Sequence, residues 1–171
     1  MPEEPLHPAA LGPDELLAQC EVRRQKRSGP GGQHRNKVET AIVLHHLPTG
    51  VRAEASERRS QAENLSRAVF RLRVNLAFEI RTPRPCDAQP SPLWRSRCCG
   101  GRIAINASHD DFPTLLAEVL DTLTAAASDP KPAAARLGCT VSQLVKFLKK
   151  EPRALSLVNR RRHNAGMHPL Q

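Results

Sequence analysis

The clearest pattern of hydrophobic and polar positions in this chain lies between residues 60 and 80. Apolar side chains recur there at steps of four and three, the spacing of one face of an amphipathic helix. Ser60 and Glu63 have the spacing of a capping box, in which each side chain pairs with a backbone amide at the helix start. The sequence therefore predicts a helix over residues 61–80 that buries its apolar stripe in the core. The stripe consists of Leu65, Val69, Leu72, Leu76 and Ile80.

Three β-strands are predicted before this helix. Residues 20–27 are mostly polar, which is typical of a strand at the edge of a sheet. Residues 38–46 are β-branched and apolar, and residues 51–55 alternate between apolar and charged side chains. Pro48 and Gly50 occupy the second and fourth positions of a type I turn between these two segments, which indicates a hairpin.

Helical patterns dominate the rest of the chain. Short helices are predicted over residues 13–19, 132–137, 141–150 and 152–162, and a longer one over residues 111–127 has Leu116, Leu120 and Leu123 on one face. The spacing of Ala134, Gly138 and Leu144 resembles that of a helix-turn-helix unit.

The organisation that follows is an α+β fold. A flexible N-terminus (1–12) precedes a small antiparallel sheet packed by one long helix (13–81). A Pro-rich linker and irregular segment (82–110), in which residues 102–106 suit a short strand, leads to a basic helical unit (111–171).

The charge of the chain points to a polyanionic partner. The formal net charge is +9 and the isoelectric point is about 10.1. Five of the acidic residues precede residue 22, so the remainder carries +14. Aromatic residues make up only 3% and there is no Tyr, which favours phosphate contacts over base stacking. A solvated basic surface with no partner is the alternative interpretation.

Composition also narrows the cellular setting and the chemistry. No run of eighteen apolar residues is present, so no membrane span is expected. The acidic N-terminus is unlike a secretory or transit signal, and five cysteines, an odd number, suit reduced thiols, so we expect a cytoplasmic protein. Cys98, Cys99 and His109 have a poor chelating arrangement, and nucleotide-binding glycine motifs are absent. We expect no metal and no cofactor.

Residues 27–37, with the sequence RSGPGGQHRNK, carry the candidate chemistry. Three glycines and a proline in four consecutive positions cannot continue a strand or a helix, so this segment is predicted to be an exposed loop. Glycines allow a close approach of the backbone to a ligand, and the flanking Arg and Lys side chains favour an anionic one.

This loop is the first of several motifs that occur together. The others are Asn36-Lys37, Thr40-Ala41, residues 46–51 (HLPTGV), Arg59-Ser60-Gln61 and Asn64. In this order and near this spacing they resemble the catalytic domain of class I peptide chain release factors, over residues 21–80.

The resemblance implies a function and a catalytic site. The family hydrolyses the ester of peptidyl-tRNA in the peptidyl transferase centre of the ribosome, and its Gly-Gly-Gln tripeptide corresponds here to Gly31, Gly32 and Gln33. The backbone amide of Gln33 is expected to stabilise the reaction centre, while its side chain shapes the pocket that admits water. The glutamine is methylated in many relatives, which makes Gln33 a candidate substrate of a glutamine methyltransferase.

The stop-codon-reading members carry large additional domains, for which 171 residues leave no room. The chain is therefore expected to belong to the codon-independent ribosome-rescue type, to act as a monomer, and to contact ribosomal RNA and peptidyl-tRNA. Two alternatives remain open: an inactive factor that only binds the ribosome, and a helix-turn-helix DNA-binding protein. The expected RNA-binding residues are Arg24, Arg27, Arg35, Lys37, Arg58, Arg59, Arg67, Arg71, Lys146, Lys149, Lys150, Arg160, Arg161 and Arg162.

Overall fold

The computed structural model of the chain describes residues 6–26, 40–85 and 87–171. It divides the chain into two compact units, Met1–Ile80 (unit 1) and Arg81–Gln171 (unit 2). Each unit has its own core. Among the described residues, no helix is long and apolar enough to cross a membrane.

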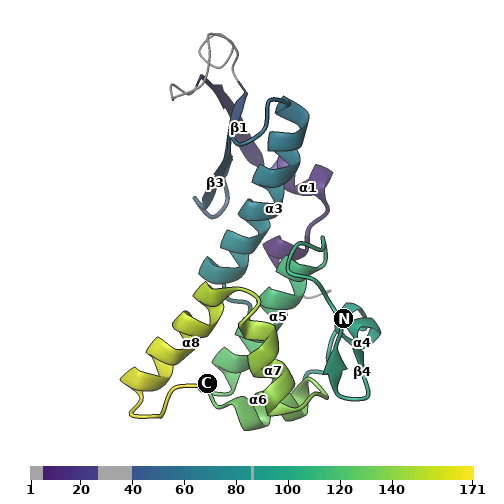
Figure 1. Cartoon of the computed structure of the whole chain (residues 1–171), viewed down its shortest axis with the longest axis vertical. Helices are drawn as coiled ribbons and strands as arrows, with labels where there is room; N and C mark the ends of the chain where they lie inside the picture. Colours follow the sequence, from purple (N-terminus) through teal and green to yellow (C-terminus); the bar gives the residue numbers. More distant parts are fainter. Residues whose placement is uncertain (1–5, 27–39, 86) are drawn as a thin grey trace. The chain divides into compact units, whose positions relative to one another are not determined.

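Unit 1 contains a three-stranded antiparallel sheet and one long helix (Figure 1). A 3₁₀ turn, η1 (Pro8–Ala10), and helix α1 (Pro13–Ala18) lead into strand β1 (Cys20–Gln25). Strands β2 (Ala41–His46) and β3 (Arg52–Ala55) form the predicted hairpin, and the sheet order β1-β2-β3 confirms that β1 is an edge strand. Gly50 ends the hairpin turn with a φ of 74°, and its amide donates to the carbonyl of His46 at 2.8 Å.

Helix α3 (Gln61–Glu79) supplies six of the fourteen buried hydrophobic residues that the structure describes in unit 1, and it packs on β2 and β3. Of the predicted stripe, Val69, Leu72 and Leu76 are buried, and Leu65 and Ile80 are half-buried. The Oγ of Ser60 accepts the predicted capping bond from the amide of Glu63 at 3.4 Å. The expected helix and its apolar face are therefore confirmed.

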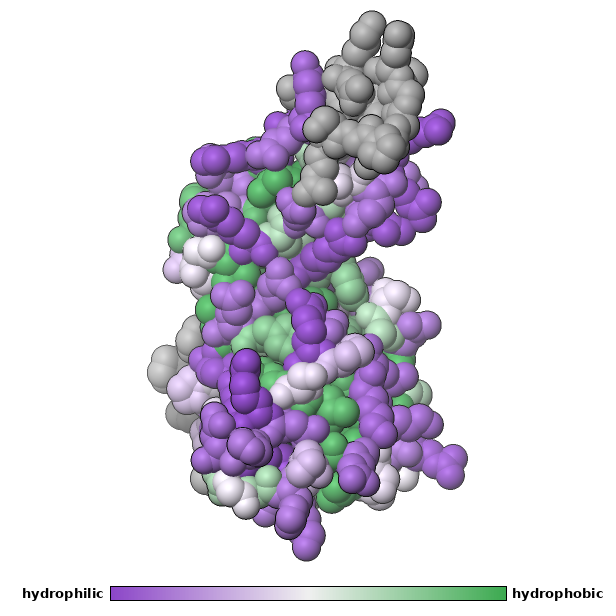
Figure 2. All heavy atoms as spheres, turned by 60° about the vertical axis from the view of Figure 1, so that its left-hand side comes forward, coloured by the Kyte–Doolittle hydropathy of each residue, from purple (hydrophilic) through white to green (hydrophobic). Residues whose placement is uncertain are grey.

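Unit 2 is mainly helical. Helix α4 (Pro92–Arg97) and a two-stranded hairpin, β4 (Cys98–Cys99) with β5 (Arg102–Ile103), precede the helices α5 (Phe112–Ala125), α6 (Pro130–Arg136), α7 (Val141–Leu148) and α8 (Pro152–Asn164). Trp94, Phe112 and Phe147 form an aromatic cluster at the centre of its core. Hydrophilic side chains dominate the outline of the face shown in Figure 2.

Two features of the sequence between residues 90 and 105 were not predicted. Ser91 caps α4 by accepting a bond from the amide of Trp94 at 3.0 Å, with Pro92 in the first helical position. Gly100 and Gly101 both have positive φ, 56° and 74°, and so form a two-residue hairpin turn between β4 and β5. These roles account for a segment whose pattern was ambiguous.

Candidate functional site

The proposed catalytic tripeptide Gly31, Gly32 and Gln33 lies outside the described residues, as do Arg27, Arg35 and Lys37. The structure instead describes the two chain segments that enter and leave this loop. Gln25, at the end of β1, pairs with Ala41, at the start of β2. The residues that flank the predicted loop therefore lie side by side at one end of an antiparallel ladder.

Asn64 connects the exit of the loop to helix α3. Its side chain is completely buried, and its Nδ2 donates to the carbonyl oxygens of Thr40 at 2.6 Å and Arg58 at 2.9 Å. Its Oδ1 accepts from the backbone amide of Arg58 at 3.0 Å. One amide side chain thus joins three elements: the residue that follows the loop, the connection between β3 and α3, and α3 itself.

The sequence marked Asn64 only as part of a motif, and its positioning role was missed. The signal was weak, because a polar residue in the first turn of a helix is usually solvent-exposed. What distinguishes this position is that it continues the buried row of Ala68, Leu72 and Leu76 at steps of four.

Several predicted RNA-binding residues lie exposed in unit 1. Arg24 is on the edge strand β1, Arg58 and Arg59 precede α3, and Arg67 is on the outer side of α3. The side chain of Asn64 hydrogen-bonds both to the backbone of Arg58 and to the carbonyl of Thr40, so Arg58 lies close to the residue that follows the predicted loop. Their contacts with RNA remain predictions.

Arg71 has a structural partner within unit 1. Its guanidinium forms an ion pair with Glu57, and its Nη1 donates to the carbonyl of Glu54 on β3 at 2.8 Å. One turn further along α3, Asn75 donates to the carbonyl of Arg52 at 2.9 Å. The two side chains satisfy outward carbonyls of the edge strand β3, so Arg71 stabilises the fold whether or not it also meets RNA.

Arg67, Arg71 and Arg73 lie close together in the sequence, which predicts one basic ridge along the helix, but Arg73 does not belong to it. It is buried, and its Nε donates to the carbonyl of Ala9 in η1 at 2.9 Å. Two residues along a helix correspond to a rotation of about 200°, which turns Arg73 away from the face of Arg71. It fastens the N-terminal segment to α3.

His46 supports the opposite end of the sheet. Its ring is buried, with Nδ1 at 2.7 Å from the Oγ1 of Thr49 and Nε2 at 3.1 Å from the Oε1 of Gln19. Burial, and to a lesser extent the neighbouring His45, lowers the pKa of His46, so the ring is neutral at pH 7. The motif residues at positions 46–49 thus hold the hairpin turn.

The predicted RNA-binding residues of unit 2 fall into two groups. Lys146, Lys149 and Arg160 are exposed and Lys150 is half-buried. In contrast, the Nη1 of Arg161 donates to the Oγ1 of Thr124 at 2.9 Å, and the guanidinium of Arg162 donates to the carbonyls of Ser128 and His168 at 2.7 and 2.8 Å. Arg161 and Arg162 therefore hold α8 and the segment after it in place.

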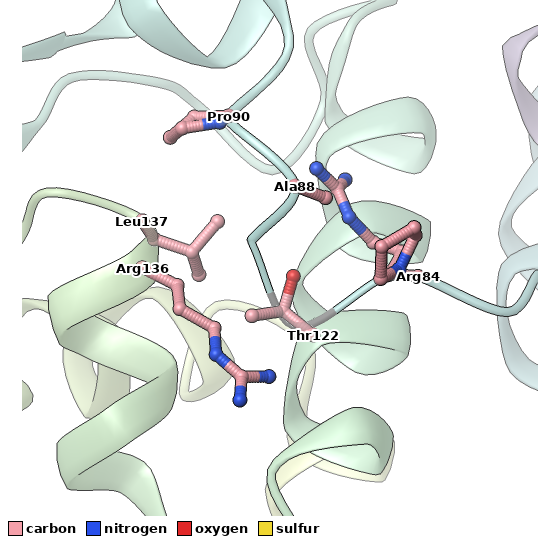
Figure 3. Close-up of a pocket in the computed structure, with 7 residues that line it drawn as sticks. Arg84, Ala88, Pro90, Thr122, Arg136 and Leu137 are labelled. Atoms are coloured by element: carbon pink, nitrogen blue, oxygen red, sulfur yellow. The ribbon is translucent and has the colours of Figure 1, made fainter.

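Unit 2 also contains a small cavity between α5, α6 and the segment before α4 (Figure 3). Its volume of about 10 Å³ is enough for roughly one water molecule, so it is too small for a substrate. Arg84 at its edge is paired with Glu118 at 3.0 Å, whereas Arg136 has a buried Nη1 with no hydrogen-bond partner among the described residues. Within the same residues, no group of three His, Cys, Asp or Glu is arranged to hold a metal ion.

Comparison with known proteins agrees with the motifs and with this framework. Residues 17–90 match the RF-1 domain family. The chain is 41% identical over 85 residues to peptide chain release factor 1 of Verminephrobacter eiseniae (strain EF01-2), a match that covers 49% of this chain and 23% of that protein. It is 40% identical over 76 residues to the chloroplastic peptide chain release factor PrfB1 of Arabidopsis thaliana, covering 44% of this chain and 16% of that protein.

A third relative, peptide chain release factor 2 of Buchnera aphidicola subsp. Baizongia pistaciae (strain Bp), is 32% identical over 83 residues, covering 48% of this chain and 23% of that protein. The chain thus spans less than a quarter of the length of these curated relatives. Residues 17–90 thus match the RF-1 domain family and are similar to parts of the peptide chain release factors named above.

Proposed function

We propose that this protein hydrolyses the ester of peptidyl-tRNA on the ribosome without reading a stop codon. The observation that carries the proposal is the Gly31-Gly32-Gln33 sequence within an RF-1 domain, on a loop whose two ends are joined by the Gln25–Ala41 pair and by Asn64. A loop that must enter a narrow RNA-lined site needs a rigid base, and this framework supplies one.

The proposed reaction requires few catalytic groups from the protein. The ester between a peptide and a tRNA ribose is already activated, so hydrolysis needs a positioned water and stabilisation of the developing negative charge. Gly31 and Gly32 allow the backbone to approach the ester closely. The amide of Gln33 donates to the reaction centre, and its side chain admits water. Ribosomal RNA provides the rest of the site.

Codon independence is the finer part of the proposal. The RF-1 match ends at residue 90, and the rest of unit 2 is a helical unit with a basic surface. Such a surface suits contacts with RNA phosphates, which carry no sequence information. We therefore assign it to ribosome binding in place of codon reading.

The test is the release of labelled peptide from peptidyl-tRNA on three substrates: ribosomes with a stop codon, ribosomes stalled on an mRNA without one, and isolated large subunits. We expect release from at least one of the last two, with no enhancement by a stop codon. Release that requires a stop codon would contradict codon independence. Binding without release on all three would favour the inactive factor.

Substitutions in the loop test the catalytic assignment. Gly31→Ala and Gly32→Ala should nearly abolish release, whereas Gln33→Ala should retain part of it, because the backbone amide survives. Gly12→Ala is the matched control, since a Cβ at Gly12 meets only the Oε2 of Glu15 at an ordinary 3.7 Å and φ there is −61°. Equal, mild losses in the three loop variants would refute the role of the amide.

A further inference from the structure

We propose that the exposed face of helix α7 binds the backbone of double-stranded RNA, through Ser142, Lys146 and Lys149. These residues are spaced by four and three, so they lie in one row along the helix, and all three are exposed. The row spans about 10 Å at a rise of 1.5 Å per residue. The inference does not rest on the proposed hydrolysis, because it concerns binding by unit 2 alone.

The charge of the chain is concentrated in the unit that carries this row. Unit 2 has fourteen Lys and Arg against seven Asp and Glu, a net charge of +7, and unit 1 has twelve against ten, a net charge of +2. Unit 2 therefore contributes most of the +9 of the whole chain.

Four of the seven acids of unit 2 form ion pairs with arginines other than the residues of this row. Asp121 pairs with Arg81, Glu118 with Arg84, Asp111 with Arg97, and Glu151 with Arg153. No carboxylate of the described residues forms an ion pair with Lys146 or Lys149. Two like charges three residues apart on a helix repel each other by a few tenths of a kcal/mol. A bound polyanion would remove this repulsion.

The opposite face of α7 is fastened to the core. Leu144, Phe147 and Leu148 are buried, and Phe147 meets the ring of Trp94 edge-on at a centroid distance of 5.8 Å. The Nε1 of Trp94 donates to the carbonyl of Leu137, at 2.7 Å, in the turn before α7. The row of Ser142 and the two lysines is thus presented on a rigid support.

The turn between α6 and α7 has the geometry that the helix-turn-helix spacing predicts. Ala134 and Leu144 are buried, and Gly138 has a φ of 64°. In DNA-binding helix-turn-helix units, the second helix is the one that lies against the nucleic acid, and α7 occupies that position in unit 2.

An open groove lies beside the row. Lys146 and Lys149 border a groove of about 600 Å³, whose other wall includes Pro169 and Leu170. That wall is held to α8, because the amide of Leu170 donates to the Oδ1 of Asn159 at 2.7 Å and the Nδ2 of Asn159 donates to the carbonyl of Leu170 at 3.1 Å.

The residue types of the row favour RNA over DNA. Two lysines supply phosphate contacts without base reading. Double-stranded RNA is recognised through phosphates and 2′-hydroxyls across its wide, shallow minor groove, and a serine hydroxyl in line with two lysines matches that chemistry. An RF-1 domain in the same chain is consistent with an RNA partner.

The experiment measures binding of the full chain to a mixed-sequence RNA duplex and to the DNA duplex of the same sequence, as a function of salt. The wild-type chain should bind the RNA duplex more tightly. The double variant Lys146→Gln/Lys149→Gln should bind RNA about tenfold or more weakly at 0.1 M salt, with a salt slope reduced by about 1.8, since each phosphate contact contributes about 0.9 to the slope.

The matched control is Arg95→Gln/Lys131→Gln, which removes two exposed charges from α4 and α6 of the same unit. It should change the affinity less than threefold. Equal weakening in both double variants would show a general charge effect and overturn the proposal, as would tighter binding to DNA. Lys146→Arg/Lys149→Arg keeps both charges and should bind RNA as the wild-type chain does. Loss of binding in that variant, with unchanged thermal unfolding, would also overturn the proposal.

Discussion

Replacing Asn64 should uncouple Thr40, which follows the proposed catalytic loop, from the body of unit 1. Asn64→Ala removes two bonds to the carbonyls of Thr40 and Arg58 and one from the amide of Arg58. A hydrogen bond of this kind contributes about 1 kcal/mol net, and a buried group that loses its partner costs about 1–3 kcal/mol. We expect the free energy of unfolding of unit 1 to fall by about 3 kcal/mol.

Asn64→Asp is a more discriminating change, because it conserves the shape. A carboxylate at this position still accepts from the amide of Arg58 but places negative charge against the carbonyl oxygens of Thr40 and Arg58. The loss at pH 7 should be at least as large as that of Asn64→Ala. It should become smaller at acidic pH, where a protonated carboxyl group donates one of the two lost bonds.

The measurement is urea unfolding followed by circular dichroism, together with the peptide-release assay under conditions where each variant is folded. Asn75→Ala is the matched control: it makes the same change on the same helix, where the bond to the carbonyl of Arg52 is exposed. It should cost less than about 1 kcal/mol. If Asn64→Ala and Asn75→Ala lose the same stability and the same activity, Asn64 does not position the loop.

Two further predictions concern unit 2. Burial raises the pKa of Asp121 to about 6, against the partial compensation of Arg81, so the folded state holds this proton more tightly than the unfolded state. This contribution to stability is full below about pH 4 and is lost as the pH rises through about 6, by up to about 3 kcal/mol. The free energy of unfolding, followed by the fluorescence of Trp94, the only tryptophan, should therefore fall less between pH 4.5 and 7.5 in Asp121→Asn than in the wild type. Equal changes in the two proteins would contradict this. Trp94→Phe removes the buried bond to the carbonyl of Leu137 and should cost about 2–3 kcal/mol by circular dichroism, because that carbonyl loses its partner; a loss under 0.5 kcal/mol would show that water replaces the indole.

The elements with strong local signals were predictable from the sequence. Helix α3 has both an apolar row and the Ser60 cap, and the structure places it at Gln61–Glu79 against the expected residues 61–80. The hairpin β2–β3 combines β-branched residues with a Pro and a Gly at turn positions. In each case, the bonds that define the element join residues close in the chain.

Two local signals between residues 90 and 105 indicate elements that we did not predict. Ser91 followed by Pro92 is a regular helix start, and Gly100-Gly101 between two short segments is a two-residue hairpin turn. The placement of Arg73 was wrong for a different reason. Arg73 is only two residues from Arg71 in the sequence, but the helical rotation places it on another face.

The role of Asn64 could not be predicted from local pattern. Its partners Thr40 and Arg58 are 24 and 6 residues away in the chain, on two different connections. Nothing in an isolated helix start reveals that an amide will be needed there to satisfy three backbone groups. Such bonds depend on the tertiary arrangement, which the sequence pattern does not contain.

The uneven charge of the two units has a consequence for the proposed reaction. The proposed phosphate contacts of unit 2, at +7, should weaken steeply as salt rises, whereas the proposed catalytic contribution of the Gln33 amide involves no net charge on the protein. Added salt should therefore reduce release at limiting factor concentration and leave the rate at saturating factor nearly unchanged. The two units would then contribute separable quantities, affinity from α7 and its neighbours and rate from the loop that Asn64 anchors.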